Sequence, residues 1–273
     1  MPTRSSGRAG RPPIVAVQSL ADLDSKTVSD LRSLRRRGIP VVSLSVMLER
    51  RLRLYVLQSG GAHDEFAGPP NLSLLYLGLK RVLDLVLGVL GVLGFLAFLP
   101  LVALAIILED GGPIFYTQDR VGRGGRVFKL LKFRSMSTDA EPLGPAWSRS
   151  DDERITKVGR VLRVSKLDEL PQFVNIVLGH MTLVGPRPER PFFVDILKRH
   201  VPHYDLRHRL RPGLTGWGTI RVGYANSIEA KLLQHQFDLW HLKNHSMRFD
   251  LEILARSLML LALRSGQIDR YML

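Results

Sequence analysis

Short apolar runs alternate with a helical pattern over the first 57 residues of the chain. Residues 14–17 are a run rich in β-branched side chains, as in a strand, and residues 24–37 repeat apolar side chains at helical spacing. A second strand is predicted over 40–44, and a short basic amphipathic stretch follows over 46–57. Together these segments predict a partial strand–helix–strand unit, which is too small to bury a sizeable core alone.

Residues rich in glycine and proline border this unit on both sides. Residues 1–13 contain arginines among Gly, Ser and Pro, with no apolar core of the kind that a secretory signal needs. We expect a disordered tail there. The Gly- and Pro-rich segment 60–70 predicts a linker, so that the unit and its linker occupy residues 14–66.

A long uncharged segment follows, from residue 85 to residue 108. It exceeds the ~20 apolar residues that a membrane-crossing helix needs. Basic residues flank it on both sides, beginning with Lys80 and Arg81 before it, and basic flanks favour the cytoplasmic side of a membrane. Pro100 would kink such a helix by removing one backbone hydrogen bond. We expect a re-entrant helix over 82–108, with a spanning helix and the core helix of a soluble protein as alternatives.

The remainder of the chain reads as one basic domain of mixed α/β class. Short strands are predicted over 114–116 and 127–131, and amphipathic helices over 170–178, 229–242 and 248–263. The last helix has an apolar pattern that suits either a lipid headgroup region or packing against the domain.

Composition adds a strong positive charge. The formal net charge is +14 and the isoelectric point is near 10.6, which favours a polyanionic partner such as nucleic acid, an anionic membrane face or a phosphorylated substrate. The chain has no cysteine, which excludes disulfides, thiolate metal sites and thiol nucleophiles.

Two adjacent carboxylates, Asp168 and Glu169, lie where a helix is predicted to begin. Acidic residues in a first turn complement the helix dipole, so a purely structural capping role is one interpretation. Arg163 precedes the pair, and Arg187 follows it between two prolines that stiffen its backbone. Carboxylates among arginines also suit Mg²⁺ and a diphosphate, which is the other interpretation.

Other candidate sites have weaker support from the sequence. The histidine pairs 200/203 and 241/245 lack an obvious third ligand at zinc spacing, which favours solvated or helix-surface histidines. The run 122–125 lacks the Gly-Lys-Ser/Thr ending of a phosphate-binding loop and indicates a turn between strands.

Seven motifs in one order resemble the bacterial sugar transferase family, the monotopic polyprenyl-phosphate phosphoglycosyl transferases. The motifs are KRVLD (80–84), GPIFYTQDRVG (112–122), KFRSM (132–136), LDELPQ (167–172), VGPRPE (184–189), RPGLTGW (211–217) and FDLWHLKN (237–244). The resemblance implies a sugar transferase domain over 75–266 that includes the membrane helix. It also implies a monotopic membrane protein with a small catalytic α/β domain.

The resemblance implies a reaction as well. The family moves a phosphosugar from a UDP-sugar to a polyprenyl phosphate, releases UMP, uses Mg²⁺ and begins exopolysaccharide or glycoconjugate synthesis. By that resemblance, Asp168 is the nucleophile that forms an acyl-phosphate intermediate, and Glu169 holds Mg²⁺. A carboxylate nucleophile divides one displacement into two, which predicts ping-pong kinetics.

The same resemblance assigns the surrounding cations. Arg163 and Arg187 are expected to hold phosphates, and Lys132 and Arg134 are weaker candidates for phosphate or headgroup contact. Pro100 is expected to bend the membrane helix, which brings the site to the membrane face.

The expected partners are a UDP-sugar, polyprenyl phosphate and membrane lipids at the cytoplasmic face of the cell inner membrane, with a homo-oligomer left open. No nucleic-acid partner is expected, because neither a helix-turn-helix nor a stacking aromatic pattern is present. Two alternatives stay open: a catalytically inactive membrane scaffold, and a basic, membrane-tethered nucleic-acid-binding module.

Overall fold

A computed structural model describes most of the chain, which divides into two compact units, 1–56 and 57–273. The described residues are 15–17, 25–37, 41–57, 72–141, 144–147, 152–223 and 225–263. The expected tail 1–13 and the expected linker both lie outside them.

The first unit contains the strand–helix–strand order predicted from its apolar pattern. Its elements are β1 (Val15–Val17), α1 (Ser25–Arg36), β2 (Val41–Ser43) and α2 (Leu44–Leu52). Strands β1 and β2 pair in parallel, with Val15 opposite Val41. A parallel pair needs a crossover between its strands, and α1 provides it.

The second unit is of mixed α/β class, as predicted. Its elements in chain order are α3 (Leu74–Asp110), β3 (Phe115–Val121), η2 (Arg123–Gly125), β4 (Val127–Phe133), α4 (Lys157–Ser165), η3 (Leu167–Glu169), α5 (Gln172–Val177), β5 (Thr182–Val184), α6 (Pro191–His200), η4 (Tyr204–Arg209), β6 (Gly213–Thr215), α7 (Trp217–Val222), α8 (Ile228–Lys243) and α9 (Met247–Leu263). The labels η2, η3 and η4 denote 3₁₀ helices.

Two small sheets organise this unit. Strands β3 and β4 form an antiparallel hairpin from Phe115↔Phe133 to Val121↔Val127, longer than the two short strands predicted. Its turn is η2, where Gly124 has a φ of 65° and Gly125 a φ of 77°. Left-handed backbone of this kind suits glycine, so the turn interpretation of 122–125 is confirmed. Strands β5 and β6 form a short parallel pair.

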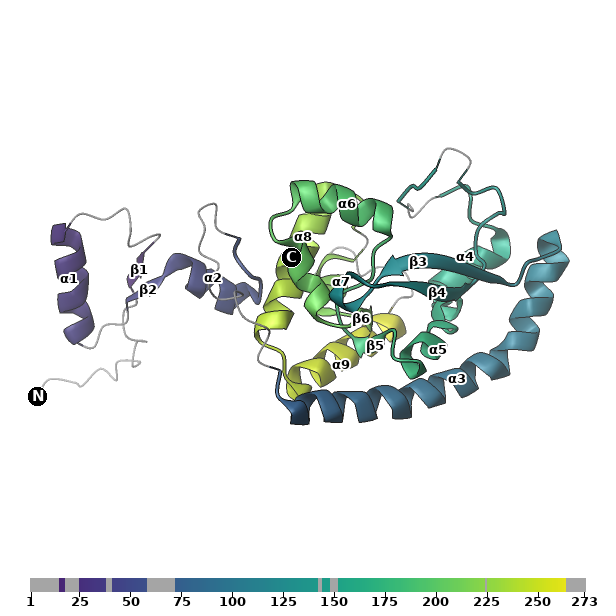
Figure 1. The fold of residues 1–273 in the computed structure, drawn as a ribbon, viewed down its shortest axis with the longest axis horizontal. Coiled ribbons are helices and arrows are strands. Elements are labelled where there is room, and N and C mark those ends of the chain that lie inside the picture. The colour runs from purple at the N-terminus through teal and green to yellow at the C-terminus, as the bar shows by residue number, and fades with distance from the viewer. Residues whose placement is uncertain are drawn as a thin grey trace, which may run out of the picture. The chain divides into compact units, whose positions relative to one another are not determined.

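Helix α3 runs without interruption through 37 residues and is drawn as one bowed helix in Figure 1. It begins earlier than predicted, because the Ser73 side chain accepts a hydrogen bond from the Tyr76 amide at 3.0 Å and caps it. It ends at Gly111, which has a φ of 83°. Pro100 lies inside the helix on its exposed side.

The apolar surface of α3 is largely uncovered. Among the residues that the structure describes, α3 is the one helix long and apolar enough to cross a membrane, and only 17% of its most apolar stretch is buried. Leu74 is 86% exposed, and most of the leucines and valines that follow along the helix are exposed too. A core helix of a soluble protein would be covered, so that alternative does not fit. A continuous apolar surface of this length is consistent with membrane association.

Two polar residues of the KRVLD motif, Arg81 and Asp84, attach α3 to the rest of the unit. Arg81 donates to the carbonyls of Ile176 and Val177 at 2.8 and 2.7 Å, which satisfies the last turn of α5. The buried carboxylate of Asp84 accepts from the Thr182 hydroxyl at 2.7 Å and so holds β5 against the helix.

Glycine allows α5 to approach α3 closely. A Cβ on Gly91 would lie 2.2 Å from the Phe173 ring, whereas one on Gly94 would meet nothing within 4 Å. Farther along α3, Phe95 and Ile106 join a core cluster with Phe133 of the hairpin. The helix therefore packs on the unit along much of its length.

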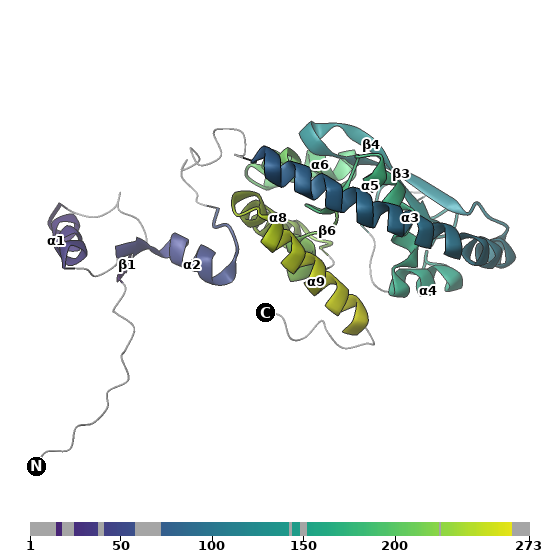
Figure 2. The ribbon, with the colours of Figure 1, turned by 90° about the horizontal axis from the view of Figure 1, so that it is seen from below.

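Helix α9 completes the attachment of α3 near its beginning, and Figure 2 shows the two helices from below. Asp250 of α9 accepts from Lys80 at 2.5 Å and from the Tyr76 hydroxyl at 3.0 Å. It also contacts His241 Nε2 at 2.8 Å. His241 is buried, so the interpretation of this histidine as solvated or on a helix surface is wrong.

Helix α9 has two different apolar faces. Phe249 and Ile253 are buried against the unit. Leu251, Leu258 and Leu261, which belong to the pattern that predicted the helix, are exposed. One face of the helix packs on the domain, which confirms that alternative for this face. The other face is uncovered, and its contact with lipid headgroups stays a prediction.

Candidate active site

The two adjacent carboxylates lie on η3, directly after α4. Lys166 has a φ of 61°, and this left-handed residue ends α4 and starts the turn that carries Asp168 and Glu169. Neither η3 nor α5 has a side-chain cap hydrogen bond, although both acids do lie in the first turn of η3, where the structural interpretation placed them. Asp168 is 5% exposed, and within the described part of the chain its Oδ1 atom has no hydrogen-bond partner.

Glu169 accepts from two cations that come from distant parts of the chain. Lys132 Nζ of β4 lies 3.1 Å from its Oε1 atom, and Arg187 Nη2 lies 2.7 Å from the same atom. Burial alone would raise the pKa of Glu169. The charges of Arg187, Lys132 and Lys166 outweigh burial and hold this pKa well below its usual range.

For the pKa of Asp168, burial outweighs the nearby positive charges. Burial raises the pKa of its carboxyl above the usual range, and the negative charge of Glu169 adds to the rise. The charges of Lys132, Lys166 and Arg163 counteract the rise without cancelling it. Glu169 is therefore held in its ionised form by the cations that it contacts. Asp168 is the more basic of the two carboxylates, and its Oδ1 atom has no hydrogen-bond partner among the described residues. Adjacent acids with divergent pKa values are typical of reactive sites.

The segment that carries Arg187 is fixed through its backbone. Four consecutive carbonyls, at 186 to 189, each accept a hydrogen bond from elsewhere in the unit. The pairs are Gly213 N to Pro186 O (2.9 Å), Arg207 Nη2 to Arg187 O (2.9 Å), Arg120 Nη1 to Pro188 O (2.8 Å) and Val121 N to Glu189 O (2.8 Å). Arg187 therefore meets Glu169 from a rigid support, at little further entropic cost.

Two charged pairs lie behind this segment. Arg207 contacts Asp238 at 2.8 Å and the Tyr204 hydroxyl at 2.5 Å, and all three side chains are buried. Lys231 donates to Glu189, which is also buried. No role was predicted from the sequence for Arg207 or Lys231, and Glu189 and Asp238 were named only as members of motifs. The burial that distinguishes them appears only in three dimensions.

Glycine allows the backbone segments around the site to touch. A Cβ on Gly213 would lie 2.1 Å from the Gly185 amide nitrogen, and a Cβ on Gly216 would lie 2.1 Å from the Gly185 carbonyl oxygen. Only glycine fits at such a distance. These contacts join the VGPRPE and RPGLTGW motifs beside the site.

Of the six predicted cations and carboxylates, the structure brings four into direct contact or adjacency, places a fifth within electrostatic reach and leaves one elsewhere. Asp168, Glu169, Lys132 and Arg187 form one cluster, and Arg163 of α4 acts on Asp168 through its charge. Arg134 instead pairs with Asp110 at the end of α3 and donates to the Pro113 carbonyl at 2.6 Å. Pro100 belongs to α3.

The carboxylates also determine which metal the site suits. Within the described residues there is no group of three or more His, Cys, Asp or Glu side chains placed to hold a metal ion. Mg²⁺ commonly takes one or two protein carboxylates together with water and phosphate oxygens. Among the described residues Asp168 Oδ1 lacks a hydrogen-bond partner, and Lys132 and Arg187 both contact the Oε1 atom of Glu169. The donor set fits Mg²⁺ that is shared with a phosphate.

Comparison with protein families matches residues 75–264 to the family described as bacterial sugar transferase. Over 196 residues the chain is 37% identical to the UDP-N-acetylgalactosamine-undecaprenyl-phosphate N-acetylgalactosaminephosphotransferase of Aeromonas hydrophila. It is 38% and 39% identical, over 177 and 180 residues, to the proteins of Escherichia coli and Caulobacter vibrioides named UDP-glucose:undecaprenyl-phosphate glucose-1-phosphate transferase.

These matches cover most of this chain and a variable share of each relative. The matches cover 72% of this chain for the Aeromonas protein, 64% for the Escherichia protein and 65% for the Caulobacter protein. They include 46% of the Aeromonas protein, 38% of the Escherichia protein and 67% of the Caulobacter protein. The chain thus spans less than half the length of two of these three relatives.

The opposite pKa shifts predict opposite effects on stability. Because the pKa of Asp168 is raised, its ionised form destabilises the folded chain at pH values above that pKa. Asp168→Asn should therefore raise the free energy of unfolding at pH 7. This gain should shrink as the pH falls through the raised pKa. Because the pKa of Glu169 is lowered, its ionised form stabilises the folded chain at pH values above the pKa that Glu169 has in the unfolded chain. Glu169→Gln should therefore cost ~1.5–3 kcal/mol at pH 7, with the loss shrinking as pH falls through the lowered pKa.

Chemical denaturation of the full chain in neutral detergent, without divalent metal, measures both effects. Asp119→Asn is the matched control, because Asp119 is 48% exposed and pairs with Lys129 on the surface of the hairpin. It should change stability by less than ~0.5 kcal/mol. A loss of stability in Asp168→Asn as large as that in Glu169→Gln would contradict the assigned shifts.

Proposed function

The chain belongs to the bacterial sugar transferase family, and we propose on this premise that it transfers sugar-1-phosphate from a UDP-sugar to polyprenyl (undecaprenyl) phosphate. UMP is released, and the lipid-linked product begins an exopolysaccharide or glycoconjugate. The names of the three relatives support this pair of substrates. The observation that carries the proposal is the buried Asp168, whose unpartnered oxygen lies among cations beside Glu169.

The reaction divides into two displacements at one phosphorus atom. In the first, a carboxylate oxygen of Asp168 attacks the phosphorus that bears the sugar. The bond from this phosphorus to the bridging oxygen breaks, and UMP leaves with the electron pair. In the second, an oxygen of the lipid phosphate attacks the same phosphorus, the bond to Asp168 breaks, and the carboxylate is restored. The product is a polyprenyl diphosphosugar.

Electrostatic neutralisation makes the first attack feasible. A diphosphate and a carboxylate repel each other unless nearby cations quench the charge. Lys132, Arg163 and Lys166 all act on Asp168 through their charges, and the fork of Arg187 suits phosphate oxygens. The same cations stabilise the charge that develops in the transition state.

Glu169 is the residue that would hold Mg²⁺. A bound ion would neutralise charge on the diphosphate and polarise its phosphoryl oxygens. The contribution of the chain is to keep Glu169 ionised. Lys132 and Arg187 do this from two sides.

Helix α3 is proposed to be re-entrant and to place the site at the cytoplasmic face of the inner membrane. The second unit holds α3 at both ends: Arg81 and Asp84 attach its beginning, and Asp110 pairs with Arg134 at its end. A spanning helix separates its two ends by the ~30 Å hydrocarbon core. A helix fastened at both ends to one small domain suits entry and return on one side.

Substitution of the two carboxylates tests the reaction. UMP release from a panel of UDP-sugars with polyprenyl phosphate and Mg²⁺ should fall at least ~10³-fold in Asp168→Asn, because the nucleophile is lost. It should fall by ~10²-fold in Glu169→Gln, because a charge that positions cations is lost. Asp119→Asn should keep the wild-type rate. Full activity in Asp168→Asn would contradict the assignment of the nucleophile, and donor binding without turnover in the wild type would indicate an inactive scaffold.

Cysteine labelling tests the topology of α3, and the chain offers a cysteine-free background. Leu75→Cys and Phe115→Cys place single thiols before and after the apolar segment. A membrane-impermeant maleimide should label neither in intact cells and both after lysis, because both ends lie in the cytoplasm. Labelling of one position alone in intact cells would show that α3 spans the membrane.

A further inference from the structure

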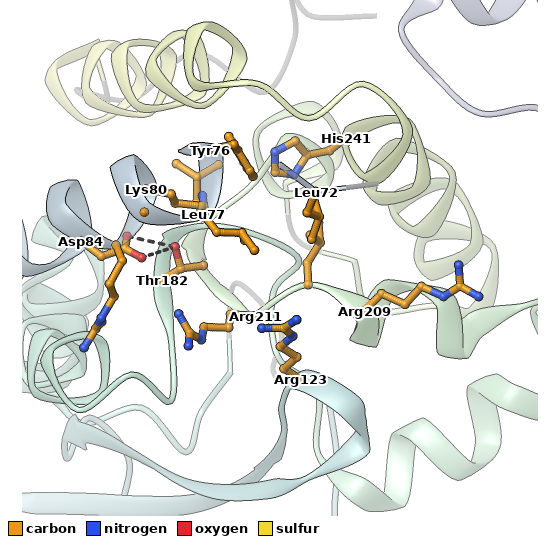
Figure 3. Close-up of a pocket in the computed structure, with 14 residues that line it drawn as sticks. Leu72, Tyr76, Leu77, Lys80, Asp84, Arg123, Thr182, Arg209, Arg211 and His241 are labelled. Carbon is orange, nitrogen blue, oxygen red and sulfur yellow. Dashed lines mark hydrogen bonds between the residues drawn. The ribbon is translucent and has the colours of Figure 1, made fainter. Parts of the chain in front are cut away.

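A cavity of about 290 Å³ lies apart from the two carboxylates, at the beginning of α3 (Figure 3). Its walls come from α3, β5, the turn η2, the end of η4 with the segment that follows it, and α8. Its basic lining residues are Lys80, Arg81, Arg123, Arg209, Arg211 and His241. Leu72 and Leu77 supply part of its apolar wall.

This cavity is separate from the proposed reaction site. None of the residues that line it belongs to the cluster around Asp168 and Glu169. Arg123 lies at the tip of the β3–β4 hairpin, whereas Lys132 pairs with Tyr116 near the other end. A strand rises ~3.3 Å per residue, so Val127 and Lys132 are roughly 16 Å apart along β4. The two regions lie toward opposite ends of the same hairpin.

Positive charge exceeds negative charge in the cavity. Lys80 is paired with Asp250, and Asp84 is the one carboxylate among the lining residues. Arg81 donates to two neutral carbonyls, so its charge is not cancelled by them. Burial lowers the pKa of Arg211, the positive charges of Arg123 and Arg81 lower it further, and the negative charge of Asp84 counteracts them in part.

Two of these arginines are available to a ligand. Within the described part of the chain, neither Arg123 nor Arg211 has an ion pair or a side-chain hydrogen bond to the protein. Figure 3 shows their guanidinium groups near each other, across the cavity from Leu77. Arginines brought together without a carboxylate between them form a site for an anion, and the planar guanidinium fork matches phosphate oxygens.

We propose that this cavity binds the phosphate group of a membrane lipid, with Arg123 and Arg211 as the donors. The inference goes beyond the proposed transfer reaction and does not depend on it. The bound phosphate occupies a second anion site, distinct from the one at Asp168 and Glu169.

The surroundings of the cavity favour a lipid over a soluble phosphate. Leu74, Leu75 and Leu79 lie on the same first turns of α3 and are exposed, so hydrocarbon beside this part of the helix would cover them. A ligand with a phosphate head and an apolar tail therefore satisfies both the arginines and the leucines. Its binding would hold the beginning of α3 at the membrane surface.

Lipid binding to the full chain in neutral detergent, followed by native mass spectrometry, tests the proposal. The probes are dioleoylphosphatidylglycerol, farnesyl phosphate, dioleoylphosphatidylcholine and inorganic phosphate. Arg123→Gln and Arg211→Gln should each weaken the binding of an anionic lipid at least ~10-fold, because each removes a charge-assisted contact. Arg126→Gln is the matched control: it removes one charge next to the same turn, and Arg126 does not line the cavity.

The arms of this experiment identify the source of the phosphate. Loss of affinity for phosphatidylglycerol or for farnesyl phosphate in the cavity variants supports the site and names its lipid. Inorganic phosphate that binds as tightly as the lipids overturns the lipid assignment. If Arg123→Gln and Arg211→Gln bind the anionic lipid as tightly as Arg126→Gln does, the site is overturned. It is also overturned if Arg187→Gln is the one variant that weakens lipid binding. Thermal unfolding of each variant confirms that it is folded, and UMP release is not measured, so failure here leaves the proposed function intact.

Discussion

The rest of this molecule depends on one constraint: Asp168 is a buried carboxylate, and its Oδ1 atom has no hydrogen-bond partner among the residues that the structure describes. Such a group is costly unless charges of opposite sign surround it. Here Lys132 comes from a hairpin, Arg163 and Lys166 from the end of a helix, and Arg187 from a proline-stiffened segment beside Glu169. The surrounding fold brings these distant cations within reach of one short 3₁₀ helix, and it keeps them in place with a further layer of buried ion pairs.

The long apolar helix α3 is part of this arrangement. It carries Asp84, which holds β5, and β5 leads directly into the segment with Arg187. Its other end is attached through the pair between Asp110 and Arg134, the residue that follows β4. The exposed apolar surface of α3 and the carboxylate cluster are therefore parts of one packed unit. If α3 lies in a membrane, as proposed above, its depth there sets the height of the carboxylates relative to lipid phosphates.

The sequence was enough to predict the elements with strong periodicity and the residues with distinctive chemistry. Helices α8 and α9, the hairpin and the adjacent carboxylates follow from spacing, and Arg187 stands out between two prolines. Strands β5 and β6 have three residues each, too few for a pattern. Arg207 was missed and His241 was misinterpreted as solvated, because the sequence does not show whether a polar side chain is buried. Arg134 was predicted to contact phosphate or headgroups, and the structure shows its pairing with Asp110, which no local pattern indicates.

The covalent role of Asp168 is the central claim, and the mass of the intact chain tests it most directly. The full chain is incubated with its UDP-sugar and Mg²⁺ but without a lipid acceptor. The account predicts a gain of one phosphosugar, located on Asp168, with release of an equivalent of UMP and loss of the adduct when polyprenyl phosphate is added. A chain that stays unmodified, yet releases UMP when donor and lipid are both present, would contradict it.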